Sequence, residues 1–144
     1  MDRISKIGPH VYVKGGVEAV KIYKEAFGLE DMGSPVLDHD GYIYHHILSR
    51  DGGFFISVSE VKYMQAKISQ EGNNDIYSIM SFTVAFDNES SLWKAYDLLY
   101  EEGNPCTGLV VEPGTTAYCD VVDKFGVYWC LYVPKKWESS FVPK

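Results

Sequence analysis

The stretch of sequence that decides the fold is His10-Val-Tyr-Val-Lys-Gly-Gly-Val-Glu-Ala-Val-Lys-Ile-Tyr-Lys-Glu-Ala-Phe-Gly28. Its first part, from Pro9 to Lys14, is rich in β-branched and aromatic residues and predicts a short strand that ends at a glycine pair. From about Val17 to Phe27 the spacing predicts a helix, and Gly28 is placed for a left-handed C-terminal cap. Apolar residues recur along this helix at i, i+3 and i+7, namely Val20, Tyr23 and Phe27. The stretch therefore predicts a strand followed by a helix with one buried face.

Three extended segments are expected after this helix. They cover about Met32 to Leu37, Tyr42 to Ser49 and Phe54 to Ser59. Asp51-Gly52 lies between the last two and is a strong signal for a two-residue hairpin turn. The first part of the chain thus predicts the order strand, helix and three strands.

The same order returns in the second part of the chain. We expect a connector over 61–77, a strand over Ile79–Phe86, a helix from Glu89 to about Tyr100 capped by Asn88, and strands near Leu109–Glu112, Thr116–Val122 and Val127–Val133. One constant offset of 73 residues aligns Lys21, Tyr23, Gly53 and the strand Phe54-Phe55-Ile56 with Lys94, Tyr96, Gly126 and Val127-Tyr128-Trp129. Such agreement predicts a duplicated module.

These patterns predict a single α+β domain over 1–144, with one βαβββ module at about 7–60, the connector at 61–77 and a second module at about 78–134. The net charge of −7, from 20 acidic and 13 basic residues, argues against nucleic acid or a membrane surface as a partner. The sequence shows no apolar run of membrane-spanning length and no signal peptide, so we expect a cytoplasmic protein. Cys106, Cys119 and Cys130 lack metal-type spacing and are expected to be free thiols.

The stretch from His10 to Gly28 resembles the opening of the PhnB-like branch of the vicinal oxygen chelate superfamily, the glyoxalase, bleomycin resistance and dioxygenase group. Asp123-Lys-Phe-Gly-Val-Tyr-Trp129 resembles its closing motif, and His45-His46-Ile47-Leu48 with Asp51-Gly52-Gly53 resembles its middle hairpin. Gly114-Thr115 departs from the pattern, because many relatives have Trp-Gly there. The resemblance implies that the two modules form a cupped, open, mixed barrel-like sheet with the helices outside, around a small-molecule site. It also implies a homodimer.

The resemblance implies four metal-ligand positions in relatives that use a divalent ion. On this chain they fall at Gly8, Ser57, Ser81 and Cys130, and none is His, Asp or Glu. Such a set binds a hard divalent cation poorly. We therefore expect no metal or other cofactor, with His10 and His46 plus an unidentified acidic residue as the alternative route to a metal.

The hairpin register predicts which side chains face the cup. A two-residue turn at Asp51-Gly52 places His46 opposite Ser57, and the 73-residue offset then places Cys119 opposite Cys130. His46, Ser57, Cys119 and Cys130 would share the concave side, with His45 pointing away. A one-residue bulge would exchange His45 and His46.

Two functions fit these observations. The first is metal-independent binding of a small organic molecule in an aromatic cup, with ligand contacts from His10, Tyr12, Tyr44, His46, Ser57, Ser81, Tyr128 and Cys130. The alternative is an enzyme of the same superfamily, a lyase, isomerase or transferase, with His46 or His45 as the base and with a divalent metal in some versions. The same residues also have a purely structural explanation. Each histidine would then be hydrogen-bonded to neighbouring groups, and Cys130 would only fill space in the packing.

Overall fold

A computed structural model of the chain describes residues 7–64, 80–110 and 115–135. The chain divides into two compact units, residues 1–71 and 72–144. Within the described residues, each unit has one α-helix and one mixed sheet, and neither sheet closes into a barrel. The fold is thus α+β, as the sequence predicts.

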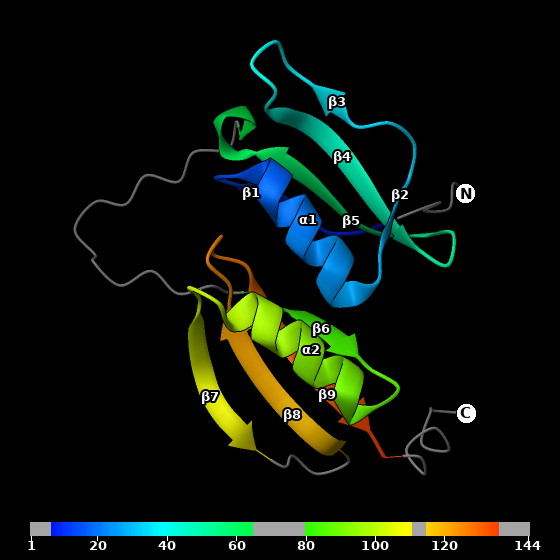
Figure 1. The fold of residues 1–144 in the computed structure, drawn as a ribbon, viewed down its shortest axis with the longest axis vertical. Helices are drawn as coiled ribbons and strands as arrows, with labels where there is room; N and C mark the ends of the chain where they lie inside the picture. The colour runs from blue at the N-terminus through cyan, green and yellow to red at the C-terminus, as the bar shows by residue number, and fades with distance from the viewer. Residues whose placement is uncertain (1–6, 65–79, 111–114, 136–144) are drawn as a thin grey trace, which may run out of the picture. The chain divides into compact units, whose positions relative to one another are not determined.

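The first unit has α1 packed across one face of its sheet (Figure 1). The strand order is β1-β5-β4-β2, with β3 also paired to β4. β1 runs parallel to β5, and the other pairs are antiparallel. The elements are β1 (His10–Val13), α1 (Gly16–Phe27), β2 (Glu30–Asp31), β3 (Val36–Leu37), β4 (Ile43–Arg50), β5 (Gly53–Glu60) and the 3-10 helix η1 (Val61–Tyr63).

The second unit repeats this plan with the strand order β6-β9-β8-β7. Both ends of α2 lie 73 residues after those of α1. The parallel register repeats at the same offset, because His10 pairs with Ser57 and Thr83 pairs with Cys130. The repeat predicted from sequence is therefore confirmed at the level of strand pairing. The elements are β6 (Phe82–Ala85), α2 (Glu89–Tyr100), β7 (Asn104–Val110), β8 (Thr115–Val122) and β9 (Tyr128–Pro134).

The core of each unit lies between its helix and its sheet. Burial of these side chains stabilises the fold by roughly 1.5–3 kcal/mol for each large one. In the first unit the fully buried large side chains are Val13, Tyr23, Ile43, Leu48, Ile56 and Val58, and in the second they are Leu92, Leu99, Cys119, Val121, Trp129 and Leu131. Since strand side chains alternate, every second residue of the central strands is committed to this core.

The two helices begin with different caps. Asn88 caps α2 as predicted, because its side chain accepts a hydrogen bond from the Ser91 amide at 2.8 Å. The residue before α1 is Gly15, which has no side chain to offer. Glu60, at the end of β5, replaces it: its carboxylate accepts from the amides of Gly15 and Gly16 at 2.9 and 2.7 Å. A buried strand residue thus caps α1.

The closing turn of the second unit is organised by one aspartate. Asp123 accepts hydrogen bonds from the amides of Phe125 and Val127 and from the indole of buried Trp129, all between 2.8 and 3.0 Å. Gly126 adopts a φ of 92°, which favours glycine. The motif from Asp123 to Trp129 therefore fixes the loop that joins β8 to β9.

Some predicted boundaries are wrong. The segment Met32–Leu37 does not form one strand, because Gly33, with a φ of 75°, and Pro35 separate β2 from β3. β7 begins at Asn104 instead of Leu109. The two-residue turn at Asp51-Gly52 is confirmed, with φ of 50° and 80° at the two residues. Most of the predicted connector, residues 65–77, lies outside the described residues.

Among the described residues, no helix has the length and apolar character needed to span a membrane.

The cap of α1 gives a test of stability. We expect Glu60→Ala to lower the free energy of unfolding by about 2–3 kcal/mol, because two helix amides lose a buried, charged acceptor. Asn88→Ala should cost about 1 kcal/mol. Urea denaturation followed by circular dichroism measures both, and exposed Glu101→Ala is the control. A Glu60→Ala effect no larger than that of the control would contradict the capping role.

Candidate functional site

The candidate site lies on the face of the first sheet that points away from α1. Along β1, Val11 and Val13 are buried towards α1 while His10 and Tyr12 alternate to the other side. Residues paired across strands share a face, and Ser57 and Ser59 are the partners of these two residues. We call this surface the far face of the first sheet, formed by His10, Tyr12, His45, Ser57 and Ser59.

Three aromatic rings meet on this far face. The rings of His10 and Tyr12 are stacked, with centroids 4.4 Å apart and an interplanar angle of 19°. The ring of His45 meets His10 edge-on at 5.4 Å. His10 is exposed, and the other two are half-buried. The far face thus presents a small aromatic platform with both polar and apolar edges.

Hydrogen bonding fixes the tautomer of His10. The Ser59 hydroxyl donates its one hydrogen to the Tyr44 carbonyl at 2.7 Å. Nε2 of His10 lies 2.7 Å from the same hydroxyl oxygen, so Nε2 must carry the hydrogen and donate it. Nδ1 of neutral His10 is then a hydrogen-bond acceptor. A ligand on the platform can be recognised there by an N–H or O–H group.

The pKa of His10 lies below its usual value of 6.5. Although His10 is exposed as a residue, its ring is partly covered by Tyr12 and His45, and this desolvation is the larger cause. The positive charge of a protonated His45 is the second cause. Both effects keep His10 neutral to lower pH. The acceptor at Nδ1 is therefore present throughout the neutral range.

The predicted register of the first hairpin is wrong by one residue. Ile47, rather than His46, lies opposite Ser57, and His46 lies opposite Val58. The cause is a bulge between Leu48 and Ser49, where β5 contributes one extra residue. This is the bulge that exchanges the two histidines, so His45 shares the far face with His10. His46 is turned to the α1 side.

His46 forms a structural contact there. It is 7% exposed, and its Nε2 lies 2.7 Å from the Asp31 carboxylate, which also pairs with Lys24 at 3.0 Å. Hydrogen bonding to Lys24 is the leading cause of a lowered pKa at Asp31, with a smaller contribution from His46. Asp31 was not anticipated, because its contact depends on the pairing of β2 with β4. Through this contact with Asp31, His46 helps to hold the edge strand β2 against β4.

The second sheet shows the same one-residue shift. Cys119 lies opposite Leu131 and is buried on the α2 side, so the expected pairing with Cys130 is wrong. Burial raises the pKa of Cys119 to about 11, which makes it a packing thiol. Cys130 instead lies opposite Asp120, on the face that points away from α2. Tyr128 is on that face too, because its hydroxyl donates to Asp120 at 2.6 Å.

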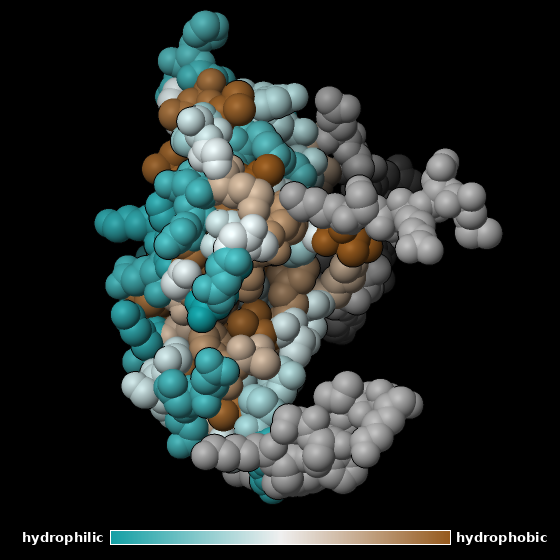
Figure 2. All heavy atoms as spheres, turned by 90° about the vertical axis from the view of Figure 1, so that its right-hand side faces the viewer, coloured by the Kyte–Doolittle hydropathy of each residue, from teal (hydrophilic) through white to brown (hydrophobic). Residues whose placement is uncertain are grey.

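The remaining predicted contacts lie elsewhere. Ser81 precedes β6 and is half-buried. Tyr44 is 54% exposed and meets Tyr63 edge-on at 4.9 Å. Tyr63 in turn donates to Asp38, which also pairs with Lys62 at 2.7 Å; these two contacts hold the pKa of Asp38 well below its usual range. Figure 2 shows hydrophobic side chains exposed among hydrophilic ones at the height of β3 in Figure 1.

The residues do not fit the metal site of metal-using relatives. A side chain at Gly8 would collide with the ring of Phe54, so this position cannot present a ligand unless that ring moves. The alternative pair fails as well, because His10 and His46 point to opposite faces of the sheet. Within residues 7–64, 80–110 and 115–135, no three His, Cys, Asp or Glu side chains converge as metal ligands.

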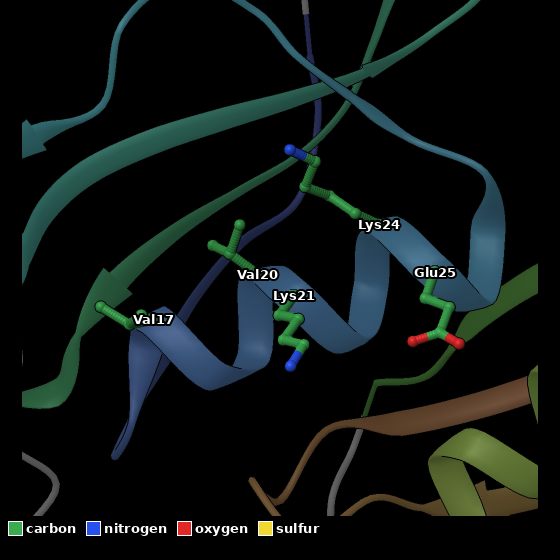
Figure 3. Close-up of a pocket in the computed structure, with 5 residues that line it drawn as sticks. All are labelled: Val17, Val20, Lys21, Lys24 and Glu25. Carbon is green, nitrogen blue, oxygen red and sulfur yellow. The ribbon is translucent and has the colours of Figure 1, made fainter.

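A pocket on α1 has a different character. Successive turns of this single helix line the pocket (Figure 3). The lining residues are Val17, Val20, Lys21, Lys24 and Glu25. It contains no aromatic or histidine side chain. We place the candidate site on the far face of the sheet.

Comparison with solved structures defines the class of fold. The structure is similar to a PhnB protein of Bacillus cereus, described as a candidate 3-demethylubiquinone-9 3-methyltransferase, with a TM-score of 0.68, 22% identity and coverage of 90% of this chain and 99% of that one. It is similar to a glyoxalase-related enzyme of Fulvimarina pelagi (TM-score 0.60, 15% identity, coverage 90% and 88%) and to a glyoxalase/bleomycin resistance protein/dioxygenase family enzyme of Burkholderia phytofirmans (0.58, 8%, 88% and 95%). The sequence matches no family model and no curated protein.

The chain therefore has the glyoxalase/bleomycin resistance/dioxygenase fold, as its sequence motifs imply. Its structural neighbours include a PhnB protein. At these identities the likeness concerns the fold alone.

The titration of His10 can be measured directly. We expect an NMR titration of the ring protons to give a pKa below 6.5, and His45→Asn to raise it, because one like charge is removed. The folded state binds this proton more weakly than the unfolded chain, so stability should fall as the pH drops below about 6.5. His39→Asn, an exposed histidine outside the platform, is the control. An unchanged His10 pKa in the His45 variant would contradict the coupling.

Proposed function

We propose that the protein is a metal-independent binding protein for a small planar organic molecule, which stacks on the far face of the first sheet. The main observation in support of this proposal is the stacked pair of His10 and Tyr12 rings with the ring of His45 at its edge. Aromatic platforms favour planar, apolar or cationic groups through stacking and dispersion. The glyoxalase/bleomycin resistance fold supports the proposal without specifying the ligand.

The chemistry of the platform narrows the class of ligand. Nδ1 of His10 accepts a hydrogen bond, so a ring that carries an N–H or O–H donor is preferred. Both serines of the face are already committed, Ser59 to Tyr44 and Ser57 to the Pro9 carbonyl at 3.4 Å. They shape the floor under the rings and add little polar recognition. The ligand is therefore a planar heterocycle or phenol rather than a polyanion.

The second candidate is an enzyme of the same fold that uses a histidine base. His45 carries this proposal, because it is half-buried on the far face within 5.4 Å of the His10 ring. His46 cannot reach a molecule there, since it lies on the α1 side and contacts Asp31. Turnover abolished by His45→Gln but retained in His46→Gln would favour the enzyme.

A homodimer belongs to the proposal as well. It is expected from the sequence resemblance, and light scattering at micromolar concentration tests it. A monomeric mass would contradict the proposal of a dimer, but it would not bear on the proposed binding site on the first sheet.

Ligand binding is tested with a panel of planar aromatic compounds. We expect at least one to raise the melting temperature, and Tyr12→Ala to weaken its binding by about tenfold, because a stacking contact is worth about 1 kcal/mol or more. Isothermal titration calorimetry measures the change. Tyr100→Ala, which removes an exposed tyrosine on α2, should bind as the wild type does. Equal affinity of the Tyr12 and wild-type proteins would refute this site.

A further inference from the structure

The second sheet carries a different set of side chains on its far face. This face points away from α2 and is formed by Tyr118, Asp120, Tyr128, Cys130 and Tyr132, placed by the register of β8 and β9. Tyr118 lies directly opposite Tyr132, and the next pair on the same face is Asp120 with Cys130. The third pair brings in Tyr128 opposite Val122. Paired residues are about 5 Å apart, and successive pairs on one face about 7 Å apart, so the three tyrosines belong to the pairs on either side of the carboxylate's own pair on this face.

Asp120 is unusual among these residues. Its side chain is a carboxylate, yet the residue is only 4% exposed. The Tyr128 hydroxyl donates to it at 2.6 Å, and this bond is the leading cause of a raised pKa at Tyr128. Burying a carboxylate costs several kcal/mol unless other interactions compensate. A poorly solvated carboxylate therefore lies on the same face as the tyrosine side chains and contacts one of them.

The neighbouring strand carries small side chains beside these residues. On β6, Thr83 lies next to Cys130 and Ala85 lies next to Tyr132, and both small residues are exposed. In the first sheet, the positions 73 residues earlier are His10 and Tyr12, which fill the same space with stacked rings. The second sheet therefore has no platform on its edge strand. Its aromatic side chains come from the central strands and lie on the same face as the carboxylate.

We propose that this tyrosine–aspartate face is a binding site for an organic ammonium cation. Tyrosine rings attract cations through the negative potential above the ring, and a carboxylate in a poorly solvated position strengthens that attraction. An anion would be repelled by Asp120, and a neutral apolar molecule would gain nothing from its charge. The acidic surface of the whole chain, with a net charge of −7, favours approach of the same class of ligand. The residues of this face belong to the second sheet, whereas the platform residues belong to the first.

The test uses choline as the probe and 3,3-dimethylbutan-1-ol as its uncharged isostere. The full chain is titrated with each compound, and proton NMR follows the ligand methyl groups and the tyrosine rings. We expect choline to shift resonances of Tyr118, Tyr128 and Tyr132 and its own methyl signal to move upfield. The isostere should bind at least about tenfold more weakly, as expected for the loss of a partly desolvated cation–π contact. Equal binding of the two compounds, or shifts confined to other residues, would overturn the proposal.

Two variants assign the site. Asp120→Asn keeps the size of the side chain and should weaken choline binding by about tenfold or more. Because Asp120 is buried and this variant can lose stability, Tyr132→Leu provides an independent test on a half-buried residue, with the melting temperature measured for both. Tyr100→Ala, which removes an exposed tyrosine on α2, should leave choline binding unchanged. Undiminished binding in a folded Tyr132→Leu protein would overturn the proposal, whatever the outcome for planar aromatic compounds.

Discussion

The pairing of each central strand with its two neighbours is the constraint on which the rest of the structure depends. β5 lies between β1 and β4, and β9 lies between β6 and β8. Once Ile56 and Val58 are buried against α1, alternation commits Ser57 and Ser59 to the opposite face. The cross-strand partners of the serines then follow them. In each sheet, the face that packs against the helix is therefore constrained by the core. The opposite face is less constrained, and the candidate sites lie on it.

The duplicated plan explains how one fold supports two kinds of surface. The backbone of the two units matches at an offset of 73 residues in the helices and in the strand registers. The side chains on the far faces do not match. Where the first sheet has His10 and Tyr12, the second has Thr83 and Ala85, and where the second has Asp120 the first has Ile47. Equivalent backbone positions therefore carry a stacking platform in one unit and a charged, tyrosine-lined surface in the other.

Much of the fold could be predicted because its signals are local. The spacing of Val20, Tyr23 and Phe27, the cap at Asn88 and the turn at Asp51-Gly52 each depend on a few adjacent residues. The assignment of His45 and His46 could not be made from sequence, because the bulge beside Leu48 leaves no mark in the ordinary strand residues around it. Glu60 was missed because the helix amides that it caps lie 44 and 45 residues earlier in the chain. Asp31 and Asp120 were missed because their contacts depend on how β2 and β8 pair with their neighbours. Three residues of the candidate site, His10, Tyr12 and Ser57, were placed on one face from sequence, and the structure does place them there. The choice of histidine required the paired strands.

The different caps of the two helices bear on the order in which the protein folds. Asn88 is adjacent to α2, so this helix can be nucleated by residues of its own segment. The amides that start α1 are capped by a carboxylate 44 residues further along the chain, on a strand that must already be in place. Closing a loop of that length costs conformational entropy before any contact compensates for it. Although the units are copies in architecture, the helix of the second can form early, whereas that of the first is coupled to assembly of its sheet.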